Sequence, residues 1–111
     1  MPTAYKVLGQ VNPSATTEST LYTSTGVQAV VSSIAVCNQT ASSATFRVAV
    51  QPAADTGSDA VARHYLVYGT TVGAADTVIL TIGVTMAAGD RIRVYASNAN
   101  LSFSAFGSEI S

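Results

Sequence analysis

Tryptophan is absent from this 111-residue sequence, cysteine occurs once, and charged residues make up only 10 % of the chain. The single Cys37 excludes an intrachain disulfide and any cysteine-rich metal site, and its apolar surroundings predict a small buried side chain. The formal net charge is −1, and the five basic residues are scattered at Lys6, Arg47, Arg63, Arg91 and Arg93. We therefore expect no direct nucleic-acid partner, because phosphate binding requires clustered positive charge.

Long hydrophobic runs and leader-like segments are also missing. No run approaches the roughly 18 apolar residues that span a bilayer. The first ten residues, MPTAYKVLGQ, contain no basic region followed by an apolar one. We therefore expect no membrane partner and no export by a signal peptide, and we expect synthesis in a cytoplasm.

The stretch from Val27 to Asn38, VQAVVSSIAVCN, is the strongest local signal that is present. It is uncharged and rich in β-branched residues, which favours a central β-strand buried on both faces. The next segment, Ala44 to Pro52, alternates apolar and polar residues as a half-solvated strand does. Because only the turn-forming sequence QTASS lies between these segments, we expect the two strands to form a hairpin.

Short strand-like segments separated by turn formers continue along the chain, and no segment has helical periodicity. In the last strand, Leu101 to Ile110, a bulge near Phe106-Gly107 would keep the large apolar residues buried. The sequence therefore predicts a single all-β domain over residues 1–111, an antiparallel β-sandwich of eight to nine short strands. Jelly-roll and immunoglobulin-like strand orders both remain open. The other expected strands cover residues 4–9, 20–24, 62–68, 77–83 and 90–96.

The N-terminal part, residues 1–19, is expected to form an extended arm with an edge strand at residues 4–9. Its second half, QVNPSATTES, is rich in turn formers, and Pro13 cannot donate to a strand ladder. We therefore interpret this half as an arm or crossover.

No residue pattern predicts a catalytic, cofactor-binding or metal site. His64 is the only histidine and has no nucleophile motif beside it, so we expect a structural or interface role. Asp55 and Asp59 share one loop, but their spacing lacks the dense oxygen ligands of a calcium site. We therefore expect no enzyme activity, no cofactor and no metal.

No charged residue lies between Glu18 and Arg47. A span of this length must reach solvent somewhere in an isolated sandwich, and an uncharged β-branched edge promotes aggregation unless something covers it. We therefore expect the domain to work inside an assembly, paired with sister copies or with a larger scaffold.

Nearly the whole chain resembles a family of small virion structural proteins of tailed bacteriophages, including cyanophages. The most specific segments are SSIAVCNQT with the following TFRVAVQPA, and the final VYASNANLSFSAFGSEI. Further segments that carry the resemblance are AYKVLGQ, TTESTLYT, HYLVYGTTV and DTVILTIGVTMAAGDRIR. The family pattern has a Val-Pro pair where this sequence has Ser24 and Thr25. The resemblance implies a β-sandwich without enzymatic activity, located in a virion assembled in the host cytoplasm.

We therefore expect a capsid cement or decoration protein that stabilises contacts between major capsid subunits, as a dimer or trimer. Residues 1–19 and the uncharged central strand are the expected contact elements. The alternatives are a tail, neck or fibre-base protein and a carbohydrate-binding module for host attachment. Carbohydrate sites usually offer exposed aromatic platforms, and with Tyr22, Tyr65, Tyr68 and Tyr95 all inside expected strands this platform is thin.

Overall fold

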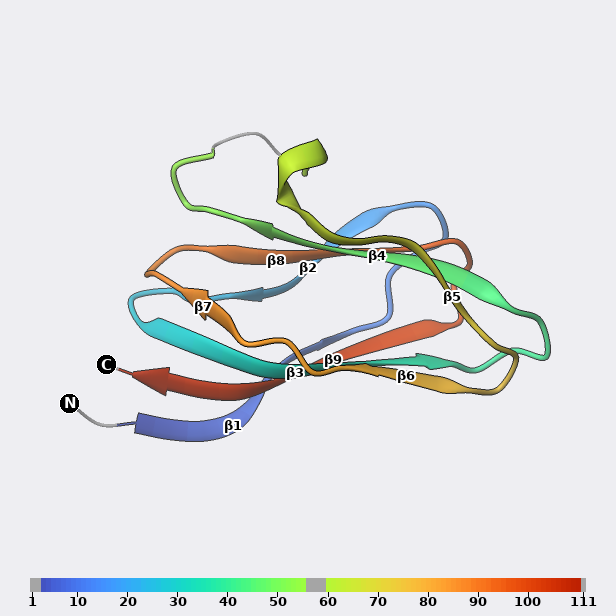
Figure 1. Ribbon diagram of the computed structural model, residues 1–111, viewed down its shortest axis with the longest axis horizontal. Coiled ribbons are helices and arrows are strands. Elements are labelled where there is room, and N and C mark those ends of the chain that lie inside the picture. The colour runs from blue at the N-terminus through green and yellow to red at the C-terminus, as the bar shows by residue number, and fades with distance from the viewer. Residues whose placement is uncertain (1–2, 56–59, 111) are drawn as a thin grey trace.

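The computed structural model describes residues 3–55 and 60–110, and most of them lie in β-strands (Figure 1). A 3-10 turn, η1 (Ala62–His64), precedes the fifth strand. The strands are β1 (Thr3–Val11), β2 (Glu18–Thr23), β3 (Gln28–Asn38), β4 (Ala44–Gln51), β5 (Tyr65–Val72), β6 (Thr77–Leu80), β7 (Val84–Met86), β8 (Arg91–Ala96) and β9 (Leu101–Ile110). The prediction of an all-β fold with about nine strands is confirmed.

Two antiparallel sheets pack face to face (Figure 1). Sheet A has the order β1-β9-β3-β6, and β7 also pairs with β3; sheet B has the order β2-β8-β4-β5. Because β6 and β7 pair with successive parts of β3, they act as one interrupted strand. The first two strands lie in different sheets, whereas they share a sheet in an immunoglobulin-like sandwich. The strand order is that of a jelly roll, with eight strands once β6 and β7 count as one.

The prediction that β3 is buried on both faces is wrong. β3 is central in sheet A, between β9 and the interrupted strand, but its side chains alternate between a buried inner face and a partly exposed outer one. The predicted hairpin is also wrong, since β4 lies in sheet B. Both strands have one apolar face, and stacking these faces in opposite sheets buries them together, which pairing within one sheet would not do.

Asn38 fixes the connection that carries the chain from sheet A to sheet B. Its side chain is buried, and Nδ2 donates to the carbonyl oxygens of Ser42, Val72 and Gly73 at 2.8, 3.2 and 3.1 Å. Its Oδ1 accepts the Thr40 amide at 3.1 Å. A buried amide group requires hydrogen-bond partners for both its nitrogen and its oxygen, and these bonds supply them. The bonds to Val72 and Gly73 also join the end of β3 to the end of β5 in the other sheet.

The core fills the space between the sheets. Phe46 of β4 and Phe103 of β9 meet edge to face in its middle, with ring centroids 6.1 Å apart. The other fully covered large apolar side chains are Val31, Ile34, Val36, Val48, Val72, Ile92, Val94 and Leu101.

Within the described residues, the N-terminal part forms an edge strand and then a crossover, which is one of the two forms that the sequence left open for residues 10–19. β1 pairs with β9 from Thr3 opposite Ile110 to Val11 opposite Phe103, and it forms one edge of sheet A. The expected edge strand is thus confirmed and is longer than predicted. Residues 12–17 then cross to sheet B, and residues 1 and 2 lie outside the described part of the chain.

The predicted bulge in the last strand is also wrong. β9 keeps a single alternation, so Phe106 and Ile110 face outward and Phe106 is 37 % exposed. The extra residues lie instead in the two neighbouring strands, at Leu8 of β1 and Ser32 of β3, beside Phe106. Because β1 and β3 contain the extra residues, β9 stays regular and the Phe106 ring remains partly exposed to solvent.

Candidate functional site

The outward face of sheet A carries no charged side chain within residues 3–55 and 60–110. The two charged residues in the strands of this sheet, Lys6 and Glu109, lie on the inward side of the alternation, where they pair with each other at 2.6 Å. The outward side chains include Tyr5, Val7, Gln10, Val30, Ser32, Ala35, Cys37, Thr77, Ile79, Ser102, Ser104, Phe106, Ser108 and Ile110. We call this surface the uncharged face.

Large apolar side chains on the uncharged face reach solvent. Tyr5 is 85 % exposed, Val7 50 % and Ile79 64 %. Val7 lies directly opposite Phe106, and Tyr5 lines a hollow of about 380 Å³ with Phe106 and Val30, which Lys6 also borders. One end of the face therefore combines exposed aromatic and aliphatic surface with a concavity, which is typical of a contact surface for another protein.

β1 adds an open sheet edge to the same region. It pairs with β9 on one side and with no other strand among the described residues. Most of its side chains are exposed. The uncharged span between Glu18 and Arg47 includes β3, but β3 is central in sheet A and forms no edge, and the open edge beside the uncharged face is β1.

The outer face of sheet B, unlike that of sheet A, carries charged side chains. Arg47 of β4 lies opposite Tyr95 of β8 and opposite Tyr68 of β5. Its guanidinium carbon is 4.1 Å from the Tyr95 ring centroid and 4.2 Å from that of Tyr68. The guanidinium thus bridges two aromatic rings across three strands, and both contacts are within the range of a cation–π interaction.

A second charged group lies beside this cluster. Glu18 Oε2 accepts from Arg93 Nε at 2.9 Å and from the Ala60 amide at 2.9 Å, and its other oxygen accepts from the Tyr65 hydroxyl at 3.4 Å. Burial and the Glu18 carboxylate raise the pKa of Tyr65, and a hydrogen bond with Arg47 partly opposes them. Tyr65 also meets Tyr68 edge to face, with centroids 4.9 Å apart.

Two adjacent hollows lie along these residues and share Ala60 and Tyr65. The larger has a volume of about 620 Å³ and is also lined by Ala62 and Tyr68. The smaller has a volume of about 410 Å³, and its remaining lining residues are Thr16, Thr17, Glu18, Arg47 and Tyr95. The sequence shows each tyrosine in a strand, but the strand pairing that gathers them around Arg47 is visible only in the fold.

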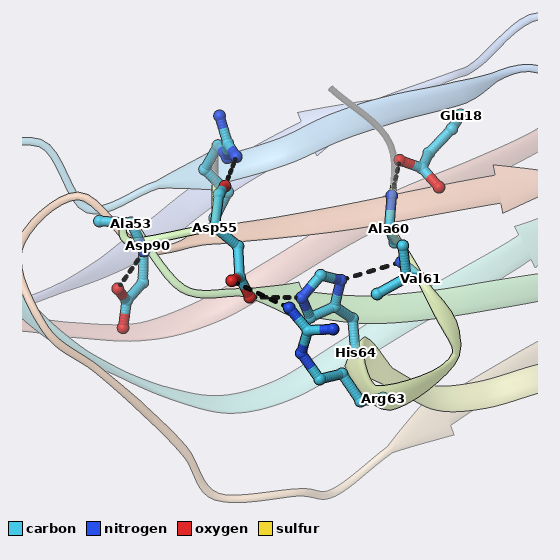
Figure 2. Close-up of polar contacts among 9 residues, drawn as sticks. Glu18, Ala53, Asp55, Ala60, Val61, Arg63, His64 and Asp90 are labelled. Carbon is cyan, nitrogen blue, oxygen red and sulfur yellow. Dashed lines mark hydrogen bonds and ion pairs between the residues drawn. The ribbon is translucent and has the colours of Figure 1, made fainter. Parts of the chain in front are cut away.

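His64 holds the loop before β5 (Figure 2). The Val61 amide donates to Nδ1 at 3.0 Å, so the ring hydrogen lies on Nε2, which donates to Asp55 Oδ2 at 2.6 Å. Arg63 donates to the other oxygen of the same carboxylate at 3.0 Å. Both ring nitrogens of His64 are occupied, and the histidine serves to position the loop.

Asp55 accepts these bonds as a carboxylate. The His64 hydrogen bond, and after it the contacts with Arg63, lower the pKa of Asp55 below its ordinary value. Arg91 donates to the Asp55 carbonyl oxygen at 3.0 Å, which fastens the start of the loop to β8. Asp59, the other carboxylate of this loop, lies outside the described residues. Among the residues that the structure describes, no three His, Cys, Asp or Glu side chains come together as metal ligands.

The chain matches no protein-family model, no curated protein and no solved structure. No helix among the described residues is long and apolar enough to cross a membrane.

Proposed function

We propose that the chain is a non-enzymatic structural protein of a phage virion, a capsid cement or decoration protein that stabilises contacts between major capsid subunits. The observation that carries the proposal is the uncharged face with the open β1 edge beside it. The phage assignment is supported by the sequence resemblance of nearly the whole chain, and jelly rolls are common in viral capsids.

The uncharged face is suited to repeated contacts of modest strength. Covering it takes no charge out of water, and its hydroxyl groups need only hydrogen-bond partners across the interface. A neighbouring segment can add to the β1 edge through main-chain hydrogen bonds, while Tyr5 and Phe106 supply apolar area. Stable interfaces bury on the order of 800 Å² on each partner. Many such contacts over a shell would together resist the outward pressure of packaged DNA.

Self-association into a dimer or trimer belongs to the same proposal. Two copies that meet through the uncharged face bring no like charges together, and the Lys6–Glu109 pair is already neutralised within one chain. Analytical ultracentrifugation at rising concentration should show a dimer or trimer. A monomer at all concentrations would contradict this part of the proposal and leave the contact with other virion proteins standing.

Electron cryo-microscopy of intact particles tests the location. Density for this jelly roll at repeated positions on the capsid shell, with the uncharged face against the shell, is the expected result. Density confined to the neck, tail tube or fibre base would replace the cement role by the alternative of a tail or neck component.

A matched pair of substitutions tests the surface. Val7→Lys places a charge on the β1 edge and should strongly reduce occupancy on particles. Leu66→Lys, at a similarly exposed position on β5 of the other sheet, should leave occupancy unchanged. Equal occupancy of both variants would contradict the role of the uncharged face. Deletion of β1 is a poorer test, because it would uncover β9 and part of the core.

Carbohydrate binding is the second candidate function. The observation that favours it is the group of tyrosines around Arg47 on sheet B, which lies on the opposite side of the molecule from the uncharged face.

A further inference from the structure

We propose that the outer face of sheet B binds saccharides that carry a carboxylate group, with Arg47 binding the carboxylate and Tyr65 and Tyr68 packing against the sugar ring. This site does not depend on the structural role proposed above, because it uses the other sheet. A capsid component can carry both surfaces, one toward the shell and one toward solvent.

Arg47 is the anion-binding group of the site. The ion pairs of the described residues involve Lys6, Arg63, His64 and Arg93, and none involves Arg47. The Tyr68 and Tyr95 rings hold its guanidinium in place, so the donor fork is ordered before a ligand arrives. A planar fork with ordered donors matches the two oxygens of a carboxylate.

The tyrosines supply the surface for a sugar ring. Tyr68 is 65 % exposed, and its edge-to-face contact with Tyr65 forms a corner on the larger hollow. The apolar C–H groups of a pyranose pack against aromatic rings, and tyrosine also presents a hydroxyl to the ligand. The volume of about 620 Å³ lies within the range of small-ligand sites, so this hollow can hold a sugar unit.

The smaller hollow extends the site beyond Arg47. Thr16 and Thr17 form its rim, and Glu18 provides an acceptor for sugar hydroxyl groups. Thr16 has a positive φ of 53°, a backbone conformation that is uncommon for a β-branched residue. Because the two hollows share Tyr65 and Ala60, they form one continuous site.

The charge pattern favours an acidic saccharide over a neutral one and over nucleic acid. Glu18 is paired with Arg93, and among the described residues Arg47 forms no ion pair and is held by tyrosine side chains alone. A polynucleotide would need several aligned cations to contact successive phosphates, whereas among the described residues this site offers one guanidinium, that of Arg47, outside an ion pair. One carboxylate on a sugar ring satisfies that single charge.

The test is a titration of the full chain with two matched probes, trigalacturonic acid and its neutral counterpart galactotriose, followed by ¹H–¹⁵N NMR. Trigalacturonic acid should bind and shift signals in β4, β5 and β8, while galactotriose should bind at least about tenfold more weakly, as expected when a charge-assisted hydrogen-bond pair is lost. Tyr68→Ala and Arg47→Gln should each weaken the binding of the acidic probe about tenfold or more. Arg47→Lys should retain only part of the affinity for the acidic probe, because an ammonium group lacks the planar pair of N–H donors of a guanidinium.

Tyr5→Ala, on the uncharged face, is the control and should bind the acidic probe as the unchanged protein does. The proposal is overturned if neither probe binds, if both bind equally, or if the sheet B variants bind like the control. Binding of inorganic phosphate as tightly as of trigalacturonic acid would also overturn it, since the site would then recognise a bare anion. Because Tyr68 is largely exposed, its substitution tests the site without threatening the fold. None of these outcomes alters the particle-occupancy result for Val7→Lys.

Discussion

The Tyr22 hydroxyl donates a hydrogen bond to Glu109 Oε2 at 2.6 Å, and this bond joins β2 of sheet B to β9 of sheet A. The other oxygen of the same carboxylate, Oε1, forms an ion pair with Lys6 Nζ of β1 at 2.6 Å. Three strands from both sheets therefore meet on one carboxylate, at the end of the sandwich where the described chain begins and ends (Figure 1). Substitutions of Tyr22 and Glu109 therefore test how these three strands are held together.

Tyr22→Phe should lower the free energy of unfolding by about 1 to 2 kcal/mol, because it removes one hydrogen bond to a charged group at a buried ring. Chemical denaturation measures the change. Tyr5→Phe is the matched control, since the Tyr5 ring is exposed, and it should change the stability by less than about 0.5 kcal/mol. Equal stability of the two variants would show that the Tyr22–Glu109 bond contributes nothing.

Stability should fall in acid partly through Glu109. The Lys6 and Tyr22 contacts lower the pKa of Glu109 below its ordinary value of 4.5. A carboxyl whose pKa is lower in the folded state stabilises the fold above its ordinary pKa, and this contribution is lost as the pH falls through the folded-state pKa. Denaturation of Glu109→Gln between pH 7 and pH 2 should therefore show a shallower decline below pH 4.5 than the unchanged protein. Parallel curves would contradict the link.

Gly107→Ala should destabilise the fold by about 2 kcal/mol or more. A Cβ at this position would meet the Val30 carbonyl oxygen of β3, so the paired backbones would have to separate. Gly83→Ala is the control, because nothing lies within 4 Å of the added Cβ and the φ angle is not positive. A thermal melt should show a lower Tm only for the first variant, and a similar Tm for both would contradict the close strand approach.

Asp55→Ala should loosen the loop before β5 while the sandwich stays folded. The change removes the partner of His64 and should expose the segment around η1 to proteases. Arg63→Ala is the control: its ion pair with Asp55 is largely exposed, and such pairs contribute little. Limited proteolysis should cut Asp55→Ala faster than Arg63→Ala, and equal cutting rates would show that the His64 bond does not hold the loop.

The sequence alone determined the elements of this protein. Strand alternation in β8, with Ile92, Val94 and Ala96 inward, and the low content of charged residues predict an all-β sandwich before the pairing of the strands is known. Local pattern suffices here because side-chain direction in a strand follows directly from the period of two. The expected edge strand at residues 4–9 depends on the same signal.

Only the tertiary structure decided how the elements pair. The short turn after Asn38 suits a hairpin and an inter-sheet arch equally, and the arch forms because it buries the apolar faces of β3 and β4 against each other. The outward position of Phe106 depends on extra residues in two other strands, at Leu8 and Ser32, which no local pattern in β9 reveals. The assembly of Arg47 with Tyr68 and Tyr95 also follows from strand register, because residues far apart in the chain become neighbours only when β4, β5 and β8 pair.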